Sequence, residues 1–214
     1  FQWSGGLFFA RTSMDFSAGF SAFPNTVING FPLRSSQSES HDATVWGEVD
    51  YRISQSLRVV PGIRFEWAKR DVENGNPAPN IQAAEDTFTA ILPSLAVKFD
   101  PNKQTSLYAR YTRGFKPGGF VADRSLTDID EFQFESESSN NFEVGFKAKL
   151  IPGTLVVNGS LFYSDFEDYQ VYNQFSPVEF GVNNAQDVTS FGGEMDLALR
   201  FAEGWRAYSG IGVT

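Results

Sequence analysis

The sequence predicts an all-β fold: an antiparallel up-and-down sheet of the kind that closes into a membrane-spanning barrel. Three observations support this prediction. Apolar and polar residues alternate with a period of two along most segments, and short and long connections alternate between these segments. No segment approaches 18 consecutive apolar residues, so no transmembrane helix is expected. A barrel needs no such run, because alternate residues of each strand face the lipid and the lumen.

The predicted strands each separate into one apolar and one polar face. In chain order they are Gln2–Phe16 (weak), Val45–Ile53, Leu57–Ala68, Phe88–Phe99 (weak), Ser106–Thr112, Phe142–Leu150, Leu155–Ser164, Glu194–Phe201 and a partial strand from Trp205. In the segment that begins at Phe142, a helix would mix Gly145 and Lys149 with phenylalanines on one stripe, whereas a strand separates the two kinds. We therefore expect eight strands and part of a ninth.

The connections predict which end of each strand is which. Turn formers mark short connections centred on Gln55, Asn102, Pro152 and Glu203, which are 47, 50 and 51 residues apart. Long connections fall between them, at roughly Ser17–Ser40, Asp71–Asp86, Lys116–Ser138 and Val171–Val188. A barrel with short periplasmic turns and long outer loops accounts for this alternation. The alternative is a soluble sheet whose charged face meets water and whose apolar face packs on a second sheet.

Composition excludes several classes of function. The 214 residues include 22 Phe, 7 Tyr and 4 Trp, a strand-rich composition of one or two domains. The net charge of -9 provides no basic field for phosphates, so we expect no nucleic-acid partner. There is no cysteine for disulfides, thiolate metal sites or a cysteine nucleophile, and the single histidine, His41, is expected in an exposed loop. We expect no catalytic residue, no cofactor, no resident metal and no enzyme.

Four motifs in order carry a family resemblance. They are the string SLYARYTRGFKPGGF at Ser106–Phe120, and the segments Asn141–Lys147, Asn158–Asp168 and Asn184–Glu194. Together they resemble the barrel of TonB-dependent receptors of Gram-negative outer membranes. The resemblance covers nearly the whole chain and is most specific from about Ser106 to Leu199.

The resemblance implies a fold and a transport function. Residues 1–214 would be part of one 22-stranded barrel domain, without the plug that fills the lumen, and both ends are expected to be artificial boundaries. The function implied is uptake of a scarce ligand (an iron-siderophore, cobalamin or an oligosaccharide) energised through TonB in the cell outer membrane of a Gram-negative bacterium. The partners implied are outer-membrane lipid, the receptor's own plug domain, the TonB complex through an N-terminal region, and a small molecule such as a ferric siderophore. A passive outer-membrane pore and a soluble all-β binding module remain alternatives.

An incomplete set of strands has a consequence for folding. Eight to nine strands of 22 leave two open sheet edges. We predict that residues 1–214 alone do not form a stable monomeric pore, and a cooperative, concentration-independent refolding transition in detergent would contradict this.

Candidate ligand residues lie on the polar face near the long loops. The expected inward residues are Arg64, Glu66, Arg110, Thr112 and Asn141, and the expected overhanging residues are Tyr172, Asn173, Gln174 and Phe175. Arginines pair with the carboxylates of a ferric chelate, and aromatic rings stack on sugars or catecholates. Charges lower on this face would instead bind the plug. The sequence does not identify the ligand.

Two acidic clusters admit two interpretations. They consist of Asp128, Asp130, Glu131, Glu135 and Glu137 in one long loop, and Asp165, Glu167 and Asp168 at a strand end. Binding of Ca²⁺ that bridges lipopolysaccharide is conceivable, but the spacing matches no EF-hand loop, so a solvated rim is the preferred interpretation. The glycines of Gly114–Gly119 are interpreted as a strand that turns into a loop, because no Lys-Ser/Thr ending of a phosphate loop follows.

Overall fold

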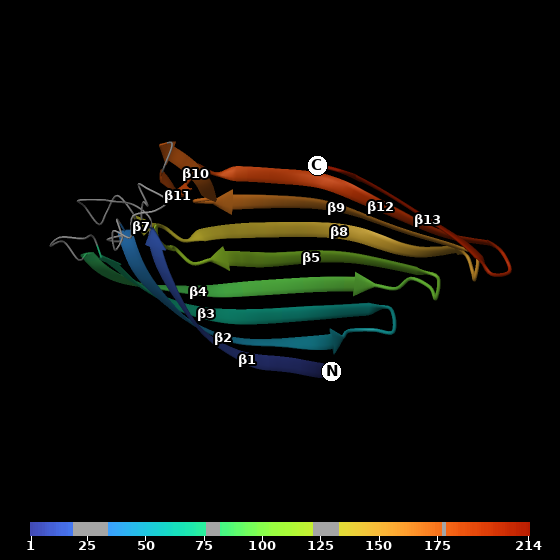
Figure 1. Ribbon diagram of the computed structural model, residues 1–214. Coiled ribbons are helices and arrows are strands. Elements are labelled where there is room, and N and C mark those ends of the chain that lie inside the picture. Colours follow the sequence, from blue (N-terminus) through green and yellow to red (C-terminus); the bar gives the residue numbers. More distant parts are fainter. Residues whose placement is uncertain (19–33, 76–81, 122–132, 177–178) are drawn as a thin grey trace.

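A computed structural model describes residues 1–18, 34–75, 82–121, 133–176 and 179–214. At the ends of these ranges, the backbone alone is described for residues 16–18, 34–35, 74–75, 82, 175–176 and 179–180. The described part is a nine-stranded antiparallel sheet in the order β1-β2-β3-β4-β5-β8-β9-β12-β13, with two small two-stranded sheets at one end (Figure 1). The sheet strands are β1 (Gln2–Ala18), β2 (Arg34–Arg52), β3 (Leu57–Gly75), β4 (Gln82–Phe99), β5 (Thr105–Lys116), β8 (Glu137–Ile151), β9 (Leu155–Glu167), β12 (Val188–Ala202) and β13 (Trp205–Val213). The nine strands of this sheet match the eight strands and partial ninth that the sequence predicted, whereas the four strands of the small sheets were not predicted.

The first four strands are longer than the sequence predicted. β3 continues to Gly75 and β4 begins at Gln82, so most of the long loop expected at Asp71–Asp86 is strand. The reason is that the outward face changes from apolar to charged toward this end, where Glu39, Asp71 and Glu85 are register partners. The inward face carries Val72 and Ala84 at the same level, so the two faces exchange their polarity along the strand and the earlier alternation does not continue, although the backbone ladder does. His41 also lies within β2, where its Nε2 is 2.9 Å from Glu39, so the prediction of a loop histidine was wrong.

The outward face carries continuous apolar rows across the sheet. One row joins Leu7, Val45, Phe65 and Ile91 from β1 to β4. Another joins Tyr111, Phe142, Tyr163 and Phe191 from β5 to β12, with the Tyr111 and Phe142 ring centroids 5.1 Å apart. The large side chains on this face stay exposed, for example Leu161 at 64%. No second layer of the described chain covers these rows, as expected for a surface that meets lipid.

The opposite face is lined with polar residues and carries two inward-folded hairpins at the long-loop end. One hairpin pairs β6 (Gly119–Phe120) with β7 (Gln133–Phe134), and the other pairs β10 (Gln170–Ser176) with β11 (Glu179–Asn184) (Figure 1). They meet in a small cluster in which buried Val72 and Val121 pack with Val182. Val72 belongs to β3, and Val182 belongs to the β10–β11 hairpin, which follows β9 in the chain. Because this hairpin reaches back to β3 across the strands between them, the sheet must curve into a trough that the hairpins bridge.

The β5–β6 connection is held close to the inner side of β4. Gly118 and Gly119 are both buried there, and a side chain on Gly118 would meet the ring of Phe88 and the backbone of Phe134. Glycine is therefore required at 118 by close approach of the backbone. The expectation that Gly114–Gly119 is a strand turning into a loop is confirmed, and the two hairpins show that the predicted long loops contain ordered strands.

Short turns close the other end of the sheet. Two of them place glycine at positive φ, Gly153 at 78° and Gly204 at 79°, a region that L side chains rarely adopt. In the β4–β5 turn, the Ser106 hydroxyl, together with the Lys98 and Arg58 cations, lowers the pKa of Asp100 below its usual 3.8. Within the described ranges, no helix is long and apolar enough to cross a membrane, a finding that bears only on helices.

Candidate functional site

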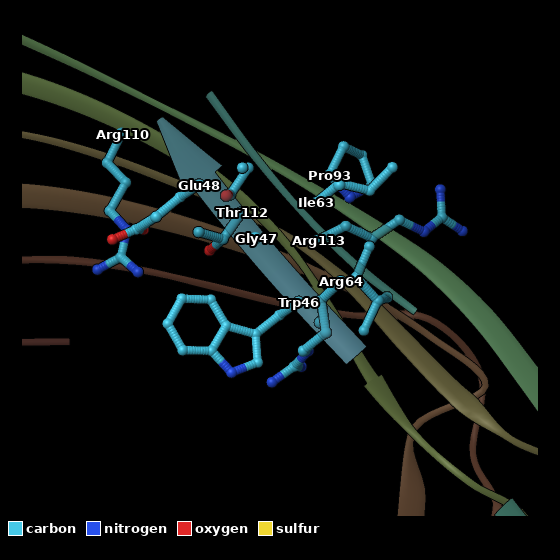
Figure 2. A pocket seen from close by; sticks show the side chains of 13 residues that line it. Trp46, Gly47, Glu48, Ile63, Arg64, Pro93, Arg110, Thr112 and Arg113 are labelled. Carbon is cyan, nitrogen blue, oxygen red and sulfur yellow. The ribbon is translucent and has the colours of Figure 1, made fainter. Parts of the chain in front are cut away.

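A hollow of about 490 Å³ lies in the wall formed by β2 to β5 (Figure 2). Its lining residues are Trp46, Gly47, Glu48, Gly62, Ile63, Arg64, Leu92, Pro93, Ser94, Arg110, Thr112, Arg113 and Gly114. Three of them are arginines, and one is a tryptophan. The hollow therefore combines positive charge with an aromatic surface.

The hollow exists because two neighbouring strands stop pairing. The β4–β5 ladder runs from Phe99↔Leu107 to Ser94↔Thr112 and ends there. The next residue of β4 is Pro93, which has no N–H to donate to a neighbouring strand. Beyond this point β4 remains paired with β3, and β5 remains paired with β8. Pro93 thus marks the point at which β4 and β5 separate, and the gap between them lies beside Arg113 and Gly114.

The cations of the hollow differ in how their charge is satisfied. Arg64 Nη2 lies 2.9 Å from Glu66 Oε1, in a partly exposed ion pair. Arg110 has no ion-pair partner within 4.0 Å among the described residues, and it is exposed on the polar face. Glu48 accepts a hydrogen bond of 2.9 Å from the Ser4 hydroxyl. Arg110 is therefore available to an incoming anion, whereas Arg64 would have to share its guanidinium with Glu66.

Trp46 supplies the aromatic wall of the hollow. Its indole lies over Gly6 of the neighbouring strand, where a Cβ would come within 2.7 Å of Nε1. Figure 2 shows Trp46, Glu48 and Arg110 on one side of the wall and Pro93 and Arg113 on the other. The 40% exposed indole leaves a ring surface on which a planar group can stack.

The structure brings together some of the residues that the sequence nominated. Arg64, Arg110 and Thr112 line the hollow, and Glu66 adjoins it through its ion pair with Arg64. Asn141 is close, but its Nδ2 donates to the Thr112 carbonyl oxygen at 3.2 Å and to the Ser139 hydroxyl at 3.0 Å. Its contacts are those of a residue that fastens β8 to β5.

The other nominated residues lie apart, on the β10–β11 hairpin. Tyr172 is 69% exposed, and Asn173 Nδ2 donates to Asn183 Oδ1 across the hairpin at 2.5 Å. Gln174 is exposed. Phe175 belongs to β10, but its side chain is outside the described residues. Of these residues, Tyr172, Asn173 and Gln174, whose side chains the structure describes, do not border the hollow between β4 and β5.

Sequence reasoning missed Trp46 and Glu48 as site residues. The available signal was the position of Trp46: it shares the polar face of β2 with Glu48 and Asp50, where an aromatic residue breaks the alternation. The hollow itself had only one signal, Pro93 within a predicted strand. Proline inside a strand indicates a place where the ladder ends.

Two carboxylates of the acidic clusters, Glu137 and Glu167, make structural contacts. Glu137 accepts the backbone N–H of Gln170 at 2.8 Å, and Glu167 accepts the Ser138 hydroxyl at 3.0 Å. Asp128, Asp130 and Glu131 lie outside the described residues. Over the ranges the structure covers, no group of three or more His, Cys, Asp or Glu side chains is arranged to hold a metal ion.

Comparison with known proteins identifies the fold independently. The family model described as "TonB dependent receptor-like, beta-barrel" matches residues 1–214. The ferric-pyoverdine BN7/BN8 receptor of Pseudomonas putida is 26% identical over 164 residues, which is 75% of this chain and 19% of that protein. The pesticin receptor of Yersinia pestis is 25% identical over 166 residues, which is 75% of this chain and 24% of that protein.

A solved structure with a similar fold is the ferric yersiniabactin uptake receptor FyuA from Yersinia pestis. It superposes with a TM-score of 0.75 at 17% identity, over 99% of this chain and 32% of that one. The chain thus spans about a fifth to a quarter of the length of the curated relatives it matches. The likeness to FyuA at this identity establishes the fold alone.

Proposed function

The chain belongs to the TonB-dependent receptor β-barrel family, and from this membership we propose that it forms part of the wall of an outer-membrane receptor that takes up a ferric siderophore. The parent receptor draws its energy from the TonB complex through a region outside residues 1–214. The names of the relatives support the ligand class, since one is a ferric-pyoverdine receptor and another a ferric yersiniabactin uptake receptor.

The contrast between the two faces of one sheet carries the proposal. The outward rows that contain Val45 and Phe142 are apolar and exposed, which suits contact with the hydrocarbon of a bilayer. The inward face carries Glu48, Arg64 and Arg110, which suits an enclosed aqueous space. Such a sheet is stable only when its edges are closed by further strands, so we place residues 1–214 in one larger barrel domain.

The hollow supports recognition of an anionic chelate. Arg110 presents a guanidinium with no competing carboxylate within 4.0 Å among the described residues, and Trp46 presents a ring face beside it. Ferric chelates carry carboxylate, phenolate or catecholate oxygens, often on aromatic rings. A guanidinium fork binds such oxygens in charge-assisted hydrogen bonds, and the indole stacks on the ring.

The remaining partners follow from the same proposal. Outer-membrane lipid surrounds the apolar rows, and a plug domain of the parent polypeptide occupies the trough below the inward hairpins. The location is the outer membrane of a Gram-negative bacterium. We propose that the chain serves binding and transport and carries out no enzymatic step.

The test uses the full-length parent receptor in a Gram-negative strain that lacks its own siderophore receptors. Uptake of radiolabelled iron is measured from a panel of ferric catecholate, hydroxamate and phenolate siderophores, with and without the proton gradient. We expect saturable uptake of one class, and its loss when the gradient is dissipated. Uptake that rises linearly with concentration and ignores the gradient would instead establish a passive pore.

Variants then connect transport to the hollow. Replacing Arg110 with Gln is expected to weaken binding of the transported siderophore about tenfold, since a hydrogen bond to a charged group is worth about 1.5–3 kcal/mol. Lys103→Gln is the control, because Lys103 lies in the exposed β4–β5 turn and does not line the hollow. If both variants bind the siderophore as tightly as the unmodified receptor does, the hollow is not part of the ligand-binding site.

A further inference from the structure

The hollow between β4 and β5 reaches both faces of the sheet. Most of its lining residues, such as Trp46 and Arg110, belong to the polar face. Four belong to the outward face, because each lies two residues along its strand from a member of the apolar rows: Gly47, Ile63, Pro93 and Arg113. Figure 2 shows Pro93 and Arg113 on the opposite side of the wall from Trp46. The hollow therefore has a second mouth, on the outward face.

The second mouth opens where the β4–β5 ladder ends. The last register pair of this ladder is Ser94↔Thr112. Toward the long loops from this pair, the two strands no longer pair with each other, although the outward face of β4 is still apolar and exposed at Ile91. Hydrocarbon offers no hydrogen bonds to backbone groups that a ladder leaves unpaired. An occupant of this opening must therefore bring polar atoms as well as apolar surface.

The lining of the second mouth is apolar on one side and cationic on the other. Ile63 and Pro93 are register partners on β3 and β4, and buried Leu92 continues this apolar side into the wall. Arg113 of β5 lies on the other side, with its Nη2 3.9 Å from Glu167 Oε2 and both side chains well exposed. An exposed ion pair at this distance contributes little, so the guanidinium is open to a second anion.

We propose that the second mouth binds one phosphorylated membrane lipid, with the phosphate on Arg113 and part of an acyl chain inserted into the hollow between Ile63 and Leu92. This inference rests on the proposed function, in which the outward face meets the bilayer. The surroundings of the mouth favour this occupant. On β4 it lies between Ile91 and Leu95, which are 65% and 43% exposed on the same face, so the molecules next to it in the membrane are lipids.

A phosphorylated lipid matches each part of the lining. Its phosphate accepts charge-assisted hydrogen bonds from the Arg113 guanidinium. Its acyl chain covers the apolar side formed by Ile63, Pro93 and Leu92, and its ester oxygens accept hydrogen bonds from backbone N–H groups at the facing edges of β4 and β5. The bound lipid would close the wall at the place where the ladder is interrupted.

The first experiment asks whether an acyl chain reaches the polar side of the wall. The full-length receptor is reconstituted into vesicles of phosphatidylethanolamine and phosphatidylglycerol, with a fraction of the phosphatidylglycerol carrying a diazirine on one acyl chain. After illumination, the labelled residues are identified by mass spectrometry. We expect label on Trp46 or Thr112, which line the hollow from the polar face, and on Leu161 of the outward face. Ser160, on the polar face of β9 and outside the hollow, should stay unlabelled.

Two results of this experiment would overturn the proposal. One is label confined to outward residues such as Leu161, because the acyl chain would then stop at the surface of the sheet. The other is label on Ser160 as strong as on Trp46, because lipid would then reach the polar face without passing through the hollow.

A charge variant tests the phosphate contact. Arg113→Gln is expected to lower the label on Trp46 about tenfold, the effect of losing a charge-assisted hydrogen bond, and Arg113→Lys should retain most of the label. Arg11→Gln is the matched control, because Arg11 is another exposed arginine paired with a glutamate, Glu39, and it does not line the hollow. Equal label in Arg113→Gln and Arg11→Gln would overturn the proposal.

A steric variant tests the acyl-chain contact and serves if the charge variant does not fold. Ile63→Trp fills the second mouth without a change of charge, so it should lower the label on Trp46 and leave the label on Leu161 unchanged. Ile91→Trp is the control, because Ile91 is similarly exposed on the same face but does not line the hollow. Undiminished label on Trp46 in Ile63→Trp would overturn the proposal.

Other occupants of the second mouth give different results. A water-filled opening would allow a water-soluble diazirine, but not the lipid, to label Trp46, and this would overturn the proposal. Siderophore uptake is measured separately. A receptor that transports but shows no lipid label on Trp46 or Thr112 refutes this inference and leaves the proposed function standing, whereas a receptor that is labelled there but transports nothing refutes the transport function and supports the lipid site.

Discussion

Gln170 Nε2 lies 3.0 Å from the carbonyl oxygen of Pro117, and this contact joins the start of the β10–β11 hairpin to the turn that follows β5. The same nitrogen also donates to the Glu135 carbonyl oxygen at 3.0 Å, and the Gln170 side chain is almost fully buried. One amide thus satisfies carbonyls from two segments that are far apart in the sequence. It fastens both inward hairpins to the wall.

Replacing Gln170 with Leu is expected to loosen the mouth of the trough. The change leaves the carbonyls of Pro117 and Glu135 without this donor, at a cost of about 1–3 kcal/mol. Amide hydrogen exchange at Gly118–Val121 in the full-length receptor should rise, while exchange in β3 stays constant. Gln174→Leu on the same strand is the control, because Gln174 is exposed. Equal exchange in both variants would show that other contacts hold the hairpins.

Replacing Gly145 with Ala is expected to destabilise the centre of the sheet. A Cβ there would lie 2.6 Å from the Tyr108 ring and 2.7 Å from the Gly159 carbonyl oxygen, and a backbone atom cannot easily move away. Shifting Tyr108 would also break its 2.5 Å hydrogen bond to Glu143. We expect a loss of about 1–3 kcal/mol in denaturant unfolding of the full-length receptor. Gly47→Ala should change little, since its Cβ would meet nothing closer than 3.8 Å.

Replacing Leu161 with Arg tests which face meets lipid. Leu161 is 64% exposed in the middle of β9, and arginine on the lipid face of a barrel costs about 2–4 kcal/mol at the bilayer midplane. The loss should appear in refolding of the full-length receptor into lipid vesicles. Ser160→Arg, on the opposite face, should cost clearly less. A larger penalty at Ser160 would reverse the assignment of the two faces.

Protonation of Asp100 is expected to weaken the β4–β5 turn in acid. Its pKa is lowered in the folded state, first by the Ser106 hydroxyl and then by Lys98 and Arg58. The carboxylate therefore contributes stability that is complete above pH 3.8 and is lost as the pH falls through the lower folded value. Unfolding of the full-length receptor is compared at pH 5 and pH 3. Asp100→Asn should shrink the difference between the two, and an unchanged difference would contradict the prediction.

Alternation predicted the strands where one face is apolar and the other polar. It separated Val45 from Glu48 and Phe142 from Glu143 correctly, because a strand with one apolar and one polar face alternates with a period of two. It failed at Asp71–Asp86, where the outward face becomes charged and the inward face carries Val72 and Ala84, so the two faces exchange their polarity while the backbone ladder continues. It also could not find the two hairpins, whose short strands are held by contacts between distant segments such as Gln170 and Pro117.

The candidate site was predictable in part for the same reason. The rule that alternate residues of a strand share a face placed Arg64, Arg110 and Thr112 on the same face of the sheet, and all three line the hollow. This rule could not show that the Asn141 side chain donates to the Thr112 carbonyl oxygen, because a hydrogen bond depends on side-chain orientation. Nor could it show that the ladder beside Arg110 ends, since that depends on how two neighbouring strands diverge in space.

The early end of pairing between β4 and β5 makes the wall mechanically uneven. These strands share six register pairs, from Ser94↔Thr112 to Phe99↔Leu107, whereas β3 and β4 share 18. Under tension across the sheet, the short ladder bears the load on the fewest hydrogen bonds and separates first. A pulling force applied to the receptor would thus separate the sheet beside Arg110. One part would contain β1 to β4, and the other would contain β5, β8, β9, β12 and β13.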